Sequence, residues 1–115
     1  MPSFELIYEQ DEDVLEVTFE TFDEHFARSI SLNDMILIHT DLSMSAAWGL
    51  TFYQYEKLLQ VGETHLDGLR PLPEADSRRL LHLLTGPPVS YFLELLDAGD
   101  LRALVKVPHL QDLLV

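Results

Sequence analysis

The spacing of apolar residues changes once along this chain, just after residue 53, and that change limits the folds open to it. Before it, apolar and polar residues alternate in short runs that are rich in β-branched and aromatic side chains. A period of two is typical of strands with one buried face. The runs predicted to be strands are 4–9, 14–20, 24–30, 34–41 and 46–52. We expect these five strands to form an antiparallel meander.

Three consecutive acidic residues, Asp11, Glu12 and Asp13, separate the first two predicted strands. Asp side chains accept hydrogen bonds from their own backbone and tolerate unusual φ angles, so they suit a hairpin turn. A calcium loop of the EF-hand type needs spaced acids, a glycine and a closing Glu, and these are missing here. We therefore interpret 10–13 as a turn and not as a metal or catalytic site.

The fourth predicted strand is apolar on both faces in its first part, with Ile36 and Ile38 on one face and Met35 and Leu37 on the other. A strand of this kind is usually central and covered on both sides. We expect the later part of the chain to supply the second cover. In the fifth run, Gly49 would permit a bulge or the close approach of another backbone.

After the fifth run the period becomes helical. Thr51 and Gln54 have the spacing of a capping box and predict a short helix over 52–60. Proline at a helix start and glycine at a helix end predict a second helix over 73–86 and a third over 88–99. These helices are expected to pack on the sheet.

The whole chain, residues 1–115, is predicted to be a single α+β domain, since a chain of this length can bury a sufficient core without disulfides or metals. Its β-rich part covers 3–53 and its helical part covers 52–115, with three or four short helices packed on the sheet. The apolar end, residues 101–115, predicts a short strand or helix. It could dock on its own domain or on a neighbouring copy.

The charge of the chain is strongly negative, with 20 acidic and 7 basic side chains and a net charge of −13. Residues 1–60 hold 12 of the acids and 2 of the bases. A field of this sign repels phosphate backbones and anionic lipid, and it attracts basic proteins. We therefore expect neither nucleic-acid nor membrane partners, and a basic protein is one candidate partner.

The chain contains no cysteine, which removes disulfides and thiolate metal sites and is compatible with a reducing compartment. The N-terminus lacks the basic start and apolar run of a signal peptide. No apolar run approaches the roughly 20 residues that span a bilayer. We expect a soluble, cytoplasmic protein.

The first half of the chain, residues 3–53, resembles the DUF2283 family of small bacterial proteins. That family has a Tyr-Asp-x-x-x-Asp-x-Leu opening, an apolar strand that ends in Asp, and a closing strand with Gly followed by alternating apolar residues. The matching positions here are Tyr8, Asp13, Val14, Leu15, Ile36, Leu37, Asp41, Gly49, Leu50 and Phe52. Glu9 replaces the first Asp of the pattern, and Thr51 replaces a Glu. The resemblance implies a small β-rich fold and no catalytic residues.

His39 and Asp41 lie two residues apart on a predicted strand and so share a face. Asp23 and His25 could approach them if the third and fourth strands pair. These four residues are weak candidates for a metal site, which needs three or four converging ligands. His39 and Asp41 are also the candidates for a small hydrolase. No glycine-rich nucleotide loop is present, so no cofactor is expected.

Two leucine clusters in the second half have the i, i+3, i+4 spacing of an apolar helix face. Such a stripe can be monomer core, a homodimer seam or a site for another protein. The interface candidates are Leu80, Leu83, Leu84, Phe92, Leu95 and Leu96. We expect a non-catalytic protein-interaction module that self-associates as a homo-oligomer. One alternative is an acidic inhibitor or antitoxin-like partner of a basic protein, and the other is the hydrolase.

Overall fold

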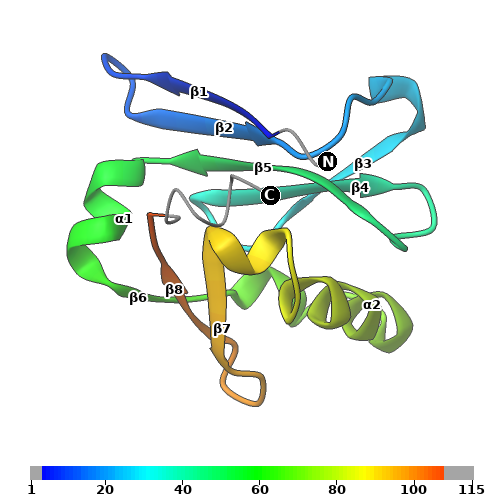
Figure 1. Ribbon diagram of the computed structural model, residues 1–115. Coiled ribbons are helices and arrows are strands. Elements are labelled where there is room, and N and C mark those ends of the chain that lie inside the picture. The colour runs from blue at the N-terminus through cyan, green and yellow to red at the C-terminus, as the bar shows by residue number, and fades with distance from the viewer. Residues whose placement is uncertain (1–3, 108–115) are drawn as a thin grey trace.

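The computed structural model describes residues 4–107 and arranges them around two antiparallel sheets (Figure 1). The larger sheet, called sheet A here, has five strands in the spatial order β1-β2-β5-β4-β3. Its strands are β1 (Glu5–Glu9), β2 (Val14–Thr18), β3 (Ala27–Ser31), β4 (Ile36–Asp41) and β5 (Ala47–Tyr53). The structure thus confirms a five-stranded antiparallel sheet in the first half of the chain.

The order of these strands corrects the predicted meander, in which each strand would lie beside the next in sequence. The strands β3, β4 and β5 do form a meander, but β5 then pairs with β2. The resulting order β2-β5-β4-β3 is a Greek key, and residues 19–26 carry the chain from β2 to the far edge. A period of two gives the face on which each side chain lies, but it does not give the neighbour of each strand.

A second sheet, called sheet B, has three strands in the order β6-β8-β7. Its strands are β6 (Glu63–His65), β7 (Leu93–Asp97) and β8 (Arg102–Val105). This sheet corrects the predicted third helix, because 88–99 holds one 3₁₀ turn, η3 (Val89–Tyr91), followed by β7. Asp97 ends β7, since its Oδ1 accepts hydrogen bonds from the backbone N–H groups of Gly99 (2.9 Å) and Asp100 (3.3 Å).

Residues 4–107 contain two α-helices and not the three or four that we expected: α1 (Tyr55–Val61) and α2 (Glu74–Leu84). The helix predicted over 73–86 agrees with α2. Two more 3₁₀ turns, η1 (Glu24–Phe26) and η2 (Asp67–Leu69), lie in connections. Neither α-helix is long and apolar enough to cross a membrane.

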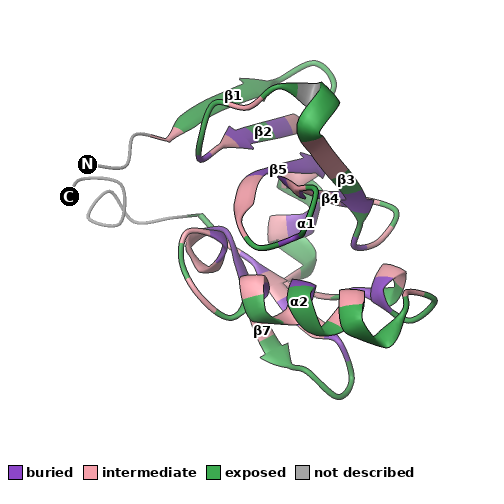
Figure 2. Ribbon diagram, turned by 90° about the vertical axis from the view of Figure 1, so that its right-hand side faces the viewer, coloured by how far each residue is buried: buried purple, intermediate pink, exposed green. Residues whose placement is uncertain are grey.

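Sheet A forms one layer of the molecule, and sheet B and α2 lie together on one side of it (Figure 1). The buried residues lie where these layers meet (Figure 2). A single apolar cluster joins sheet A, sheet B and α2 through residues such as Val17, Ile38, Leu80 and Ala103. We expected cover on both faces of β4. The helices and sheet B cover only one face, and Leu37 lies half-buried on the other, called the outer face here.

The acidic run forms the turn between β1 and β2, as predicted. Asp13 has a φ of 55°, and its Oδ1 accepts a hydrogen bond from the backbone N–H of Glu56 (3.0 Å) at the start of α1. This contact replaces the predicted capping box. Thr51 lies inside β5, and Gln54 makes no side-chain hydrogen bond to the start of the helix.

Candidate functional site

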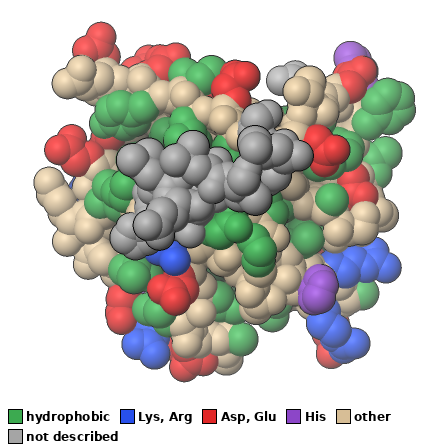
Figure 3. Space-filling model, viewed as in Figure 1, with side chains coloured by type: hydrophobic (Ala, Val, Ile, Leu, Met, Phe, Trp, Pro, Cys, Tyr) green, Lys and Arg blue, Asp and Glu red, His purple; other side chains and the backbone are tan. Residues whose placement is uncertain are grey.

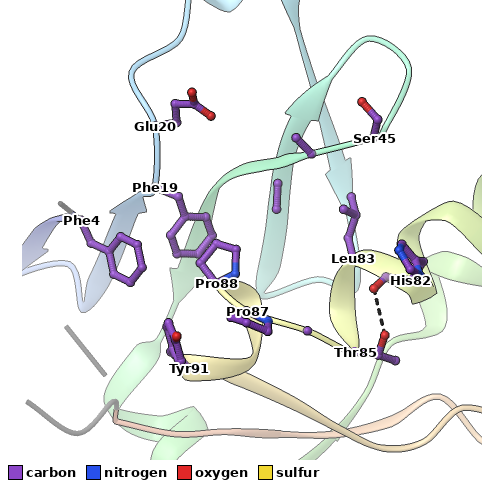
Figure 4. Close-up of a pocket in the computed structure, with 13 residues that line it drawn as sticks. Phe4, Phe19, Glu20, Ser45, His82, Leu83, Thr85, Pro87, Pro88 and Tyr91 are labelled. Atoms are coloured by element: carbon purple, nitrogen blue, oxygen red, sulfur yellow. Dashed lines mark hydrogen bonds between the residues drawn. The ribbon is translucent and has the colours of Figure 1, made fainter. Parts of the chain in front are cut away.

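A hollow of about 580 Å³, called the apolar chamber here, opens between the end of sheet A and the C-terminal half of α2 (Figure 4). Its apolar lining consists of Phe4, Phe19, Ala46, Ala47, Leu83, Pro87, Pro88 and Tyr91. The rings of Phe4 and Phe19 meet edge to face at 5.3 Å, and the Tyr91 ring lies 5.9 Å from Phe4. Ligand sites are typically apolar hollows of roughly 300–1,000 Å³ with few polar groups, so the chamber is a candidate small-molecule site.

The few polar groups of the chamber lie at its rim. Glu20 lies on the side of Phe19, whereas His82 lies on the side of Leu83 (Figure 4). The Thr85 hydroxyl donates a hydrogen bond to the backbone carbonyl of His82 (2.9 Å), which ties down the end of α2. The rim therefore has a side with a carboxylate and a side with an imidazole.

A second hollow of about 750 Å³ adjoins the chamber and shares Ser45 and His82 with it. Arg78 and Arg79 line it, and basic and His side chains gather over α2 on this face of the molecule (Figure 3). We call Arg78, Arg79 and His82 the basic rim. Two adjacent arginines form a local basic cluster in a chain whose net charge is −13.

The two arginines of the basic rim differ in their partners. Arg78 is 2.6 Å from the carboxylate of Glu74, one helical turn away. The guanidinium of Arg79 instead contacts the backbone carbonyl oxygen of Ser43 at 3.5 Å. Within residues 4–107 it forms no ion pair with a carboxylate. A guanidinium has five N–H donors, so Arg79 retains capacity for an anion.

Asp41, a predicted catalytic and metal candidate, organises the β4–β5 loop. Its carboxylate accepts hydrogen bonds from the Ser43 hydroxyl (2.9 Å), from the Ser45 hydroxyl (2.5 Å) and backbone N–H (2.7 Å), and from the Ala46 N–H (3.0 Å). Partial desolvation opposes ionisation, but these hydrogen bonds outweigh it and lower the pKa of Asp41 to about 2. A carboxylate with this low pKa is a poor general base at neutral pH.

His39, the other predicted catalytic residue, lies on the outer face of sheet A. Its Nδ1 is 2.7 Å from the Ser29 hydroxyl and its Nε2 is 2.8 Å from the Thr51 hydroxyl. A Ser beside an imidazole has the geometry of a nucleophile and its base. The second nitrogen, however, meets a hydroxyl and not a carboxylate, so the predicted pairing of His39 with Asp41 is replaced by contacts to two hydroxyls.

Aromatic rings border His39 on the outer face. Phe22, in the β2–β3 connection, stacks 6.1 Å from the His39 ring and 5.5 Å from Trp48. The register between β4 and β5 shifts here, because His39 pairs with Gly49 and Thr40 pairs with Ala47. Trp48 lies between these pairs. The bulge expected beside Gly49 is thus present, and it brings Trp48 to the outer face with Phe22.

The metal candidates do not come together. Asp23 and His25 form their own contact in the β2–β3 connection, where Nδ1 of His25 is 2.9 Å from Oδ1 of Asp23. Hydrogen bonds from the backbone and the ring of His25 lower the pKa of Asp23. Among the described residues, no group of three or more His, Asp or Glu side chains converges as a metal would require.

The leucine stripe forms core in place of the predicted interface. Leu80, Leu84 and Phe92 are 0–1% exposed inside the single chain. Leu83 and Leu95 are half-buried against the same cluster, and Leu96, the last of the six candidates, is 41% exposed. Of the six predicted interface residues, Leu96 is thus the one that is exposed.

Among residues 4–107, the longest run of exposed large apolar side chains lies instead on β1, which forms one edge of sheet A. Leu6, Ile7 and Tyr8 are 42%, 46% and 43% exposed. Strand alternation places Leu6 and Tyr8 on one face and Ile7 on the other. Glu5 and Glu9 flank the run, so the strand has an apolar centre between two carboxylates.

Comparison with known proteins finds no matching family model, no matching curated protein and no matching solved structure. The resemblance to the DUF2283 family therefore stays a prediction.

Proposed function

We propose that this protein is a non-catalytic interaction module that binds an extended segment of a basic partner protein along β1. The observation that supports this proposal is the run Leu6, Ile7 and Tyr8, three consecutive apolar side chains exposed on an edge strand. Natural proteins usually protect such edges with charges, prolines or bulges, and exposed apolar edges are sites of strand addition.

Addition of a strand to β1 would satisfy the backbone groups of its free edge and cover apolar side chains on both of its faces. The two ends of β1 define the partner. Cross-strand neighbours of opposite charge stabilise a pair of strands, so Glu5 and Glu9 favour lysine or arginine opposite them. The negative field of the first 60 residues would also speed the encounter with such a partner.

The same charges disfavour the self-association that we expected from the sequence. An antiparallel pair of β1 strands centred on Ile7 places Glu5 of one copy opposite Glu9 of the other, twice. Like charges in directly opposed positions are destabilising. If the register shifts by two residues in either direction, Glu5 or Glu9 of one copy lies opposite Ile7 of the other. A basic partner avoids both problems, so we favour the acidic-partner alternative over the homo-oligomer.

The test uses the full chain and two short synthetic peptides that share a Val-Ile-Val centre, one flanked by lysines and the other by glutamates. We expect the lysine peptide alone to bind, to shift backbone amide resonances of β1, and to weaken as salt is added. Ile7→Lys should abolish this binding. Val61→Lys makes the same charge change at another exposed apolar position (64% exposed) and should leave it intact.

Equal binding of both peptides, or shifts outside β1, would contradict the proposal. A dimer measured by light scattering for the chain alone, and lost in Ile7→Lys, would support the homo-oligomer instead. A partner that co-purifies with this protein from the cytoplasm of the native host at low salt should contain a strand with an apolar centre between basic residues.

A further inference from the structure

We propose that the apolar chamber and the basic rim together form a binding site for a small amphipathic carboxylate, with its apolar body in the chamber and its carboxylate at Arg79. This site shares no residue with β1, so a ligand can bind here whether or not a strand adds to β1.

The chamber is suited to an apolar body because its walls are held in place. Phe4, Phe19 and Tyr91 form one ring cluster, and Phe19 also packs 5.9 Å from the fully buried Phe92. Pro88, which lies beside the Phe19 ring, has a fixed φ, and Leu83 projects from α2 on the opposite side (Figure 4). A preformed hollow binds without the cost of ordering its own side chains.

The carboxylate is assigned to the basic rim because charge is distributed unevenly around the two hollows. Arg79 is held near the β4–β5 loop by its contact with the Ser43 carbonyl (3.5 Å) and retains donors for an anion. His82 lines both hollows, so the chamber continues into the basic rim. Arginine binds carboxylates through a planar pair of N–H donors, a geometry that lysine lacks.

Two carboxylates of the chain restrict the ligand further. Glu20 lies on the side of the chamber away from His82 (Figure 4), so an anionic group would be repelled there. Asp41 already takes the hydroxyl hydrogens of Ser43 and Ser45, which therefore cannot donate to a ligand. A site with one available guanidinium and two carboxylates nearby favours a singly charged ligand over a phosphate that carries two charges.

The test compares decanoate with decanol, two probes that share an apolar chain and differ in charge, below the concentration at which decanoate forms micelles. We expect the full chain to bind decanoate saturably and more tightly than decanol, with amide shifts at Ser45, Leu83 and Tyr91. Arg79→Gln should weaken decanoate binding roughly tenfold or more, the loss expected for one charge-assisted hydrogen bond, and should erase the preference over decanol. Arg70→Gln removes an exposed arginine that does not line either hollow and should change neither affinity.

Three results would overturn the site: no saturable binding of decanoate, equal affinity for decanoate and decanol in the unaltered chain, or equal decanoate affinity in the unaltered chain and Arg79→Gln. Shifts confined to β1 would overturn it as well. The dispersion of the amide spectrum of Arg79→Gln reports whether that variant is folded, which separates loss of the anion contact from loss of the structure.

Discussion

The hydroxyl of Tyr8 donates a hydrogen bond of 2.6 Å to Oδ1 of Asp13, the same oxygen that accepts the backbone N–H of Glu56 at 3.0 Å. The Asp13 carboxylate thus joins the C-terminal end of β1, the hairpin turn and the start of α1. Because β1 also carries the exposed apolar run, this bond helps to hold the proposed partner strand site in place.

We expect Tyr8 to titrate abnormally. Its hydrogen bond to Asp13, its partial desolvation and the negative charge nearby raise the pKa of Tyr8 to about 12 from the ordinary 10.0. Because the pKa is raised, the protonated Tyr8 hydroxyl stabilises the folded protein below pH 10, and this stabilisation is lost as the pH rises towards 12. An ultraviolet titration of the four tyrosines should lose this late component in Tyr8→Phe.

The matched variant is Asp13→Ala, which should return the pKa of Tyr8 towards its ordinary value, while Asp11→Ala in the same turn should not. The pKa of Tyr55 is also raised, by burial, and its titration should remain in all three variants. A late component that survives in Tyr8→Phe at full size would show that Tyr8 is not its source.

Asp41→Asn should destabilise the protein at neutral pH by roughly 1–2 kcal/mol, because a neutral amide accepts the loop's hydrogen bonds more weakly and the exposed site is partly screened by water. The pKa of Asp41 is lowered from the ordinary 3.8 to about 2. The contribution of the ionised Asp41 to the free energy of unfolding is therefore present above pH 4 and is lost as the pH falls towards 2. Urea unfolding at several pH values should show the gap between the two proteins closing in this window. A gap of constant size down to pH 2 would contradict this account.

Gly49→Ala should cost roughly 1–3 kcal/mol, the usual range for forced overpacking. A Cβ at Gly49 would lie 2.6 Å from the backbone carbonyl oxygen of Val17 and 3.5 Å from the His39 ring. Backbone of a central strand cannot move aside as a flexible side chain can. Gly86→Ala, where a Cβ meets nothing within 4 Å, is the control and should stay within about 0.5 kcal/mol in thermal unfolding. Similar losses in both variants would mean that the close approach to Val17 is not the cause.

Thr51→Val tests the hydrogen bond to His39 on the outer face. Thr51 is 6% exposed and its hydroxyl is 2.8 Å from Nε2 of His39, so a valine of nearly the same shape removes the bond alone. We expect a loss of roughly 1 kcal/mol in chemical unfolding. The control is Thr18→Val, in β2 on the same outer face of sheet A. An equal loss of stability in this variant would mean that the loss in Thr51→Val does not come from the bond to His39.

The sequence predicted those features of the fold that depend on neighbours along the chain. The turn at 10–13, the five strands of sheet A and the helix at 73–86 all follow from local period and turn chemistry. The third helix did not form because Leu93 and Leu95 face the core at a period of two, and Asp97 turns the chain back. Leucine is common in helices and in buried strands alike, so composition could not separate the two.

The candidate sites were harder to predict, since they depend on strand order and on surfaces from distant segments. His39 was identified, and pairing the third and fourth strands would also have indicated Ser29, its direct cross-strand neighbour. To identify Thr51 and Phe22 as neighbours of His39, one would also have needed the strand order of the Greek key and the position of the bulge. The apolar chamber joins Phe4 to Leu83, and no local pattern connects residues so far apart.

The Greek key also determines the order in which the strands of sheet A can pair during synthesis. Synthesis runs from the N-terminus, so the β1–β2 hairpin leaves the ribosome before the β3–β4–β5 meander, yet the inner edge of β2 pairs with β5. Until Tyr53 has been translated, both edges of this hairpin lack partners, and an isolated two-stranded hairpin is marginally stable. The hairpin is thus secured after the β3–β4–β5 meander, and during this interval its edges can pair with the wrong strand.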